Sequence, residues 1–171
     1  DEVQASYGRT GKMWAMEHED LKPDIVTLGK GIGSGVSVSA VCSTTEIFSC
    51  LAKGEMSSTY GGNPVSSAAV TAVLEIFEKE NLVENSAKMG DYMKQALQKM
   101  AEKCRYVGDI RGMGLVMGIE FVTDKTSKTP APQLIKQVID KCAENGLLVG
   151  SVGMYGNVIR VAPPLVITQQ Q

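Results

Sequence analysis

Histidine is almost absent from this sequence, and its cysteines do not cluster. The only histidine among 171 residues is His18, so a site built on histidine acid–base chemistry or a Ser-His-Asp triad has almost no candidates. The four cysteines, Cys42, Cys50, Cys104 and Cys142, form no C-x-x-C pair, which excludes a structural zinc site. Free cysteines are usually buried. The pattern therefore predicts reduced, buried thiols and a cytoplasmic location, or a mitochondrial one if the source is a eukaryote.

The sequence also lacks an excess of either charge and lacks long apolar runs. Its 17 basic and 19 acidic residues give a net charge of −2. The sequence therefore lacks the excess of positive charge that binding to nucleic acid or to an anionic membrane requires. No apolar run approaches the roughly 20 residues that a bilayer span needs, and the first residues do not have the pattern of a signal peptide. The remaining composition, 43% hydrophobic and 21% charged, predicts an ordinary globular protein with one sizeable domain or two small lobes.

Neither end of the sequence carries the signals of a complete element. Asp1-Glu2-Val3-Gln4 has no capping signal and resembles the end of a strand. Thr168 is placed to cap a helix for which only three further residues follow. We therefore expect the chain to be a fragment that is truncated at its end.

The sequence predicts strands that alternate with helices in its first half. A smaller α+β lobe is predicted to follow. Apolar residues at helical spacing between 65 and 104 predict two amphipathic helices, the second of which connects the two parts. The predicted domains are 1–80, a connecting helix 81–104, and 105–171. The predicted elements are irregular structure over 5–20, a buried strand 24–28, a tight loop 31–35, a strand 36–42, a capping box at 43–46 with a helix to 53, a polar loop 54–63, a helix from 64, strands 115–122, 147–149 and 158–161, a turn 124–129 and a helix 132–145.

Lys30 is the first residue that this pattern marks for chemistry. It follows the predicted buried strand and precedes Gly31-x-Gly33-x-Gly35. A lysine at the end of an apolar strand is partly desolvated, which favours the uncharged amine, and such an amine forms a Schiff base with an aldehyde. A surface lysine beside a flexible loop explains the same residues.

Phosphate binding by the same glycine-rich loop is a rival from another class of protein. A P-loop has its glycines before the lysine and a serine or threonine directly after it, whereas here Gly31 follows Lys30. The spacing G-x-G-x-G also differs from the dinucleotide-binding G-x-G-x-x-G. The order of residues therefore argues against a nucleotide-binding module.

Two further charged residues are candidates for ligand binding. On a strand, Asp1 and Val3 share one face, and an acid at the end of a buried strand needs a cationic partner such as a protonated pyridine nitrogen. A solvated terminal acid is the alternative for Asp1. Arg160 is the only one of four arginines inside an apolar predicted strand, and a buried arginine demands an anion. We interpret Arg9 and Arg111, in glycine-flanked turns, as structural.

Four ordered blocks of this sequence resemble the class III aminotransferases. Residues 155–160 are most similar to the 4-aminobutyrate and related ω-amino-acid transaminases of that family, and the resemblance covers essentially the whole chain. The four blocks are Asp1-Glu2-Val3-Gln4 through Gly8-Arg9-Thr10-Gly11-Lys12, Pro23-Asp24-Ile25-Val26-Thr27-Leu28-Gly29-Lys30-Gly31, Thr59-Tyr60-Gly61-Gly62-Asn63-Pro64, and Ile159-Arg160-Val161-Ala162-Pro163-Pro164-Leu165.

The resemblance implies an α/β fold of the aspartate-aminotransferase type (PLP fold type I), with a partial large domain and a small α+β C-terminal domain. It implies pyridoxal 5′-phosphate as cofactor, attached to Lys30, which also moves the proton between the substrate α-carbon and C4′ of the cofactor. Asp1 would pair with the pyridinium nitrogen, Val3 would pack on the ring, and Gln4 would bind the ring 3-hydroxyl. Thr59 would bind the phosphate in the partner subunit of a homodimer or a dimer of dimers.

The implied reaction is transfer of an amino group from an amino acid, such as the ω-amino acid 4-aminobutyrate, to a 2-oxo acid. Arg160 would hold a substrate carboxylate through a bidentate pair. Decarboxylation, racemisation and aminomutase chemistry on the same scaffold stay open, because side-chain placement decides which bond breaks. A catalytically silent fragment with a structural or interaction role is the alternative from another class.

Two differences from the family pattern bear on the site. Residues 35–40 read Gly-Val-Ser-Val-Ser-Ala where the family usually shows a Gly-Leu-Pro-Leu-Gly-like stretch, so packing near the cofactor is expected to differ. The glycine-rich phosphate loop and the aromatic ring that the family's N-terminal half supplies are not in this sequence.

Overall fold

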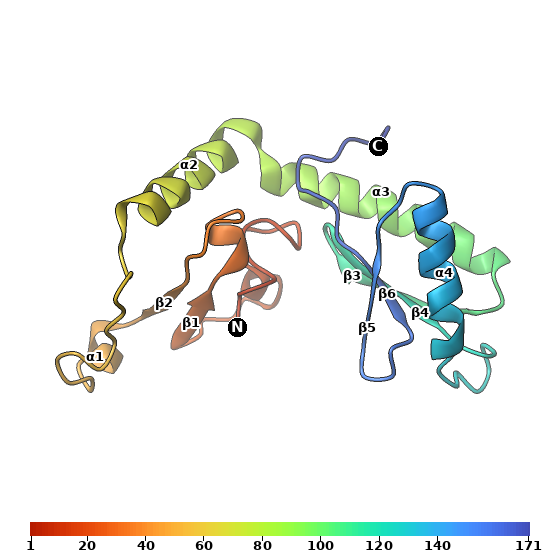
Figure 1. The fold of residues 1–171 in the computed structure, drawn as a ribbon, viewed down its shortest axis with the longest axis horizontal. Coiled ribbons are helices and arrows are strands. Elements are labelled where there is room, and N and C mark those ends of the chain that lie inside the picture. The colour runs from red at the N-terminus through yellow and green to blue at the C-terminus, as the bar shows by residue number, and fades with distance from the viewer. The chain divides into compact units, whose positions relative to one another are not determined.

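The structure, a computed structural model, describes residues 1–171 as two compact units, Asp1–Glu84 and Asn85–Gln171. Each unit has a hydrophobic core of its own. Figure 1 shows the elements of both units. No helix has the length and apolar character that crossing a membrane requires.

The first unit is built around a short two-stranded sheet. Its strands pair antiparallel, with Ile25 opposite Ser43 and Leu28 opposite Ala40. Tyr7 lies at the centre of the core and makes edge-to-face ring contacts with Trp14 and Phe77, at centroid distances of 5.4 and 6.1 Å. The elements are η1 (Ala15–Glu19), β1 (Ile25–Leu28), η2 (Lys30–Ile32), β2 (Ala40–Ser43), α1 (Thr45–Phe48) and α2 (Pro64–Glu80).

Three local predictions for this unit are wrong at their boundaries. The strand expected from residue 36 begins at Ala40, because the chain is still turning at Val36, whose N–H donates to the Gly33 carbonyl (3.0 Å). The helix expected to reach residue 53 ends at Phe48. Its cap is Thr44, whose Oγ1 accepts from Ile47 N–H, while the hydroxyl of Ser43 donates to the Asp24 carbonyl instead. The secondary-structure propensity of the sequence predicted these elements correctly. Hydrogen bonds with neighbouring groups determine the residues at which they begin and end.

The second unit packs two helices, α3 and α4, on a four-stranded antiparallel sheet of order β3-β4-β6-β5. Ile135 of α4 lies in the same core cluster as Phe121 and Ile159 of the sheet, and α4 lies against the strands in Figure 1. The elements are α3 (Leu82–Lys103), which begins in the first unit, then β3 (Val107–Met113), β4 (Val116–Phe121), α4 (Pro132–Glu144), β5 (Gly150–Val152) and β6 (Val158–Val161).

The sequence reading missed β3 and misplaced β5. In β3, glycines at 108 and 112 and two charged residues mask the apolar alternation, which pairing with β4 enforces. The strand expected at 147–149 lies at 150–152, because Leu147 N–H donates to Cys142 O and so still belongs to the end of α4. Leu148 is 88% exposed as a result.

The cysteines are free, as predicted, but none is buried. Cys42 and Cys50 are exposed, and Cys104 and Cys142 are half-buried. The expected burial is wrong because β2 is an edge strand and Cys50 follows the last turn of α1.

Packing in the second unit depends on the absence of a side chain at Gly90 of α3. A Cβ at this position would overlap the backbone of Gly114, in the turn between β3 and β4. The helix therefore approaches the turn as closely as two backbones allow, an approach that only glycine permits.

We predict that Gly90→Ala lowers the free energy of unfolding of the protein by about 1–3 kcal/mol, the usual cost of overpacking. Gly150→Ala is the matched control, because a Cβ there would meet nothing within 4 Å, and we expect a change within about 0.5 kcal/mol. Urea denaturation measures both variants. An equal loss in the two would contradict the close helix–turn contact.

Candidate functional site

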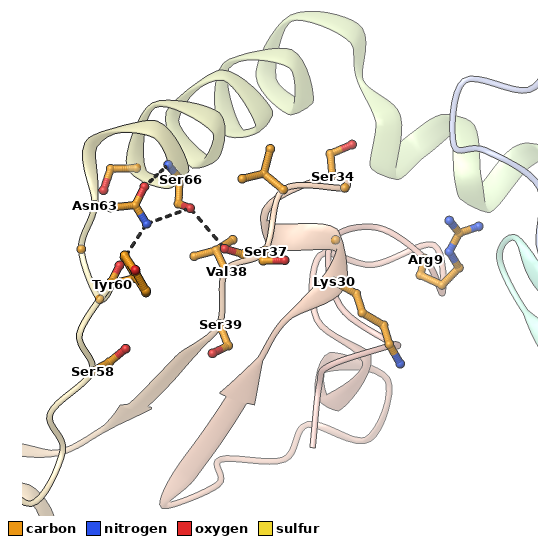
Figure 2. A pocket seen from close by; sticks show the side chains of 16 residues that line it. Arg9, Lys30, Ser34, Ser37, Val38, Ser39, Ser58, Tyr60, Asn63 and Ser66 are labelled. Carbon is orange, nitrogen blue, oxygen red and sulfur yellow. Dashed lines mark hydrogen bonds between the residues drawn. The ribbon is translucent and has the colours of Figure 1, made fainter.

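A polar cleft of about 980 Å³ opens beside the end of β1 in the first unit. Its walls are the turn after β1, the approach to β2, and the stretch that leads into α2 (Figure 2). Arg9 and Lys30 contribute the charged side chains of the lining. Six of the other lining residues are serines: Ser34, Ser37, Ser39, Ser58, Ser66 and Ser67. A cleft rich in hydroxyls and backbone N–H groups suits an anionic, polar ligand.

The N-terminus of α2 forms one wall of this cleft, and Asn63 organises it. The Asn63 Oδ1 accepts from Ser66 N–H (2.9 Å), and its Nδ2 donates to the Tyr60 carbonyl (3.0 Å). The Ser66 hydroxyl donates in turn to the Ser37 carbonyl (3.2 Å), which ties α2 to the segment before β2 (Figure 2). A helix N-terminus of this kind favours negative charge. The sequence reading missed Asn63, although asparagine followed by proline at the first helical position is a cap signal.

Lys30 is the first residue of η2 and is separated from the end of β1 by Gly29. Its φ of +45° lies in the left-handed region, which is uncommon outside glycine. A Cβ on Gly29 would lie 3.2 Å from Val3 Cγ1, and a Cβ on Gly31 would lie 3.2 Å from Tyr7 Cβ. The side chain of Lys30 is exposed at the cleft. The predicted desolvation of this lysine is therefore wrong for the residues of this chain.

The segment that begins at Asp1 lies against the end of β1, but it is not the end of a strand as predicted. It forms a turn in which the Asp1 carboxylate accepts from Val3 N–H (2.8 Å). Asp1 and Gln4 are exposed and Val3 is half-buried. Through the contact between Val3 and Gly29, the fold brings this segment next to Lys30.

Glu2 is the residue of this region to which the sequence reading gave no role. It is only 5% exposed. Its carboxylate accepts from Met16 N–H (2.7 Å) and Ala15 N–H (3.0 Å), the first residues of η1. Its own N–H donates to the Thr27 carbonyl of β1 (3.0 Å). One residue thus joins the Asp1–Val3 turn, the strand that leads to Lys30, and η1. No sequence signal indicated this, because its partners are backbone groups.

Of the predicted site residues, only Lys30 lines this cleft; Asp1, Val3 and Gln4 do not line it, and neither do Thr59 and Arg160. Thr59 is exposed and is not part of the cleft wall, although Ser58 and Tyr60 on either side of it are. Arg160 lies in β6 of the second unit, half-buried and without an ion pair or a side-chain hydrogen bond. Arg111, interpreted as structural, pairs with Asp109 and Glu120.

Comparisons with known proteins agree on one family. The family model described as aminotransferase class-III matches residues 1–171. Over 169 residues, 99% of the chain, the sequence is 45% identical to the mitochondrial alanine–glyoxylate aminotransferase 2 homolog 2 of Arabidopsis thaliana. It is 42% identical over 170 residues, again 99% of the chain, to an alanine/serine racemase of Pyrococcus horikoshii. It is 39% identical over 165 residues, 96% of the chain, to the 5-aminovalerate aminotransferase DavT of Pseudomonas putida.

A solved structure gives the same result for the fold. The crystal structure of a Bacillus anthracis aminotransferase superimposes with a TM-score of 0.92 at 42% identity, over 99% of this chain and 40% of that one. The chain spans 35–39% of the length of the three curated relatives. The expected fold, a partial α/β domain of the aminotransferase type with an α+β lobe, is confirmed.

The geometry around Glu2 leads to a prediction about stability. Glu2→Gln keeps the size of the side chain, but one of its two acceptor oxygens becomes an N–H₂ group facing a backbone N–H. We expect the free energy of unfolding to fall by about 1–3 kcal/mol, the cost of leaving a buried group unsatisfied, and amide exchange to quicken at Ala15 and Met16. Glu17→Gln is the control, since its carboxylate takes a single hydrogen bond at the surface, from Trp14 N–H. Equal effects of the two substitutions on stability and exchange would refute the assignment.

Proposed function

The chain belongs to the class III aminotransferases, a family of pyridoxal-phosphate-dependent enzymes, and we propose that it forms the lysine-bearing part of an enzyme that transfers an amino group from an amino acid to a 2-oxo acid. The observation that carries the proposal is the place of Lys30, at the end of β1 beside a polar cleft, with Val3 packed on Gly29. A 4-aminobutyrate-like ω-amino acid is the proposed donor, which the likeness to a 5-aminovalerate aminotransferase supports.

The residues around this cleft fit the proposed cofactor. Lys30 offers an exposed amine for attachment, and Asp1 offers an exposed carboxylate next to the same strand end. The serine hydroxyls and the N-terminus of α2 are suited to an anion. When bound, pyridoxal phosphate supplies an electron sink for the substrate α-carbon.

Each proposed role follows from the chemistry of the side chain. Lys30 would attach the cofactor and carry a proton to and from the substrate α-carbon, which an amine without a fixed partner can do. Asp1 would keep the pyridine nitrogen protonated through charge pairing. Val3 would pack against one face of the ring, and Gln4 would hydrogen-bond the ring hydroxyl.

Arg160 is proposed to bind the substrate carboxylate. Its guanidinium has no partner among the residues of this chain, and its planar fork matches a carboxylate through two parallel hydrogen bonds. The apolar neighbours Val158 and Ile159 are buried, so β6 fixes the base of the side chain. The proposed substrates are therefore an amino acid and a 2-oxo acid, which both carry this group.

We also propose a division of the chain into domains and a subcellular location for the protein. Residues 1–80 would belong to the large cofactor-binding domain, 81–104 to a connecting helix and 105–171 to the small domain. A cytoplasmic location, or a mitochondrial one in a eukaryote, is supported by the free cysteines and by a mitochondrial relative.

Racemisation is a second candidate, favoured by the 42% identity to an alanine/serine racemase. The same lysine and the same cofactor chemistry serve both reactions, because each begins with loss of the α-proton. Incubating the enzyme with a single enantiomer separates them. Inversion without any 2-oxo acid indicates a racemase, whereas amino-group transfer that requires a 2-oxo acid indicates the aminotransferase.

We expect borohydride reduction of the full-length holoenzyme to fix the cofactor on Lys30. Peptide mapping by mass spectrometry locates the label, and Lys30→Ala should abolish it. Lys12 is the internal control, since its Nζ already donates to the Glu17 carbonyl (2.8 Å). A label on Lys12 or Lys53 would end the proposal.

Replacing the fork of Arg160 by a point charge should weaken carboxylate binding. We expect Arg160→Lys to raise KM for both the amino acid and the 2-oxo acid about 10-fold or more, while the absorbance of the bound cofactor stays unchanged. Arg105→Lys is the control, because Arg105 stacks over the Tyr106 ring, 4.5 Å from its centroid. Unchanged KM values for both substrates in Arg160→Lys would show that the role is wrong.

We also propose that the enzyme is at least a homodimer in which Thr59 reaches the partner's cofactor phosphate. The stretch 54–62 is exposed throughout, and Thr59 is not part of its own cleft. Two inactive variants of the full-length protein, Lys30→Ala and Thr59→Glu, should regain part of their activity when mixed, because one hybrid site has both residues intact. No recovery, in samples shown to exchange subunits, would assign Thr59 to its own subunit's site or to none.

A further inference from the structure

Thr59 and Tyr60 lie at the centre of a short turn that precedes α2. The turn is closed by the N–H of Gly61, which donates to the Ser58 carbonyl (3.2 Å). A Cβ on Gly61 would lie 3.2 Å from the Cβ of Ser58, so the two ends of the turn are in close contact. Gly62 follows with a φ of +68°, in the left-handed region that favours glycine. These features set the shape of the turn, but they do not tie it to the rest of the unit.

Asn63 provides that tie. The N–H of Ser66 can pair only with the amide oxygen of Asn63, Oδ1 (2.9 Å), so the partners themselves determine the orientation of the amide. Its Nδ2 therefore donates to the Tyr60 carbonyl (3.0 Å) and to the Ser66 hydroxyl (3.1 Å). Figure 2 shows these hydrogen bonds meeting at Asn63. One side chain thus has two roles that use different atoms: Oδ1 caps α2, and Nδ2 holds the turn.

The first turn of α2 is itself anchored to another part of the unit. Ser66 is only 8% exposed, and its hydroxyl donates to the carbonyl of Ser37 (3.2 Å), 29 residues earlier in the sequence. Ser37 lies between η2, which begins with Lys30, and β2. Hydrogen bonds therefore connect the turn, through Asn63, to the segment that follows Lys30, and the turn is not held by a free helix end.

We propose that Asn63 is a positioning residue for Thr59, because its Nδ2 holds the Ser58–Gly61 turn in the conformation from which Thr59 reaches the phosphate of the partner's cofactor. This inference rests on the proposed role of Thr59. A loop that contains glycines loses conformational entropy when it is ordered, and ordering it at the moment of binding weakens the affinity. A hydrogen bond that holds the turn before the ligand arrives removes part of that cost. Asn63 acts through Thr59 and does not itself contact the cofactor.

The variant Asn63→Ser separates the two roles of the side chain. Serine caps a helix about as well as asparagine, but it has no donor at the place of Nδ2. In the full-length apoprotein, we expect Asn63→Ser to raise the Kd of pyridoxal 5′-phosphate about 3- to 10-fold, the effect of one net hydrogen bond. The Kd of pyridoxal, which has no phosphate, and the midpoint of urea denaturation should stay at the parent values. Absorbance titration measures both Kd values.

Two further variants control for the substitution and for the cap. Asn145→Ser makes the same change at the end of α4, where the Nδ2 of Asn145 donates to the Lys141 carbonyl (2.8 Å), and we expect it to change neither Kd. Asn63→Ala removes the cap as well as the donor. We expect it to weaken pyridoxal phosphate binding as much as Asn63→Ser does, and also to lower the urea midpoint.

A double variant tests whether Asn63 acts through Thr59. Thr59→Val removes the hydroxyl and should raise the Kd of pyridoxal phosphate, but not that of pyridoxal. If Asn63 only positions Thr59, adding Asn63→Ser to Thr59→Val should raise the Kd no further, because the two effects are not additive. A further rise would show that Asn63 affects the site by another route, and it would overturn the inference.

Hybrid dimers test whether Asn63 serves the partner's site. A dimer of one Lys30→Ala subunit and one Asn63→Ser subunit, purified with two different tags, has a single site that contains a lysine. The Thr59 turn of that site comes from the Lys30→Ala subunit, whose Asn63 is intact. Borohydride labelling should therefore be half-maximal at the pyridoxal phosphate concentration of the parent enzyme. The higher concentration required by the Asn63→Ser homodimer would place the effect of Asn63 in its own subunit's site, contrary to the inference.

The outcomes distinguish a failure of the inference from a failure of the proposed role of Thr59. If Thr59→Val weakens pyridoxal phosphate binding but Asn63→Ser does not, Thr59 keeps its role and that of Asn63 is overturned. If Asn63→Ser weakens the binding of pyridoxal equally, the variant is damaged in general and the inference falls. If Thr59→Val leaves the Kd of pyridoxal phosphate unchanged, the proposed role of Thr59 fails, and the inference fails with it.

Discussion

The buried carboxylate of Glu2 is the constraint on which the geometry of the first unit depends. It accepts hydrogen bonds from Ala15 and Met16, while the backbone of the same residue pairs with Thr27 of β1. A buried charge is tolerated only when such donors replace water. Because Glu2 lies between Asp1 and Val3, fixing it also fixes both proposed cofactor contacts against the strand that ends at Lys30. One short segment therefore contains Glu2, which stabilises the fold, and the two residues that are proposed to contact the cofactor.

Two arginines of the second unit lie on one face of its sheet and differ in their partners within this chain. Arg111 is neutralised by two carboxylates on the same sheet face, whereas Arg160 is flanked by glycines and has no acid of its own. An unpaired guanidinium on a strand is costly unless a ligand completes it. The contrast between the two arginines supports the proposed role of Arg160 in binding a substrate carboxylate.

Much of the fold could be predicted from local patterns. The β-branched run before Lys30, the proline that opens α2 and the apolar spacing of α4 all predicted elements that the structure contains. The predictions were wrong where contacts with residues distant in the sequence determine the secondary structure. β3 carries glycines and charges that hide its pattern, and only pairing with β4 makes it a strand. The cap at Thr44 and the late start of β2 depend on which backbone and side-chain groups happen to lie nearby.

The sequence by itself determined the family, because ordered motifs around Asp1, Lys30, Thr59 and Arg160 need no coordinates to be recognised. Its single histidine and its four separated cysteines also left few candidates for a site built on histidine or on paired cysteines. Only the tertiary structure decided that Glu2 is buried, that Val3 packs against Gly29, and that Arg111 pairs with Asp109 and Glu120. The physical reason is that the identity of a side chain is local, whereas its partners lie on segments that meet only when the chain folds.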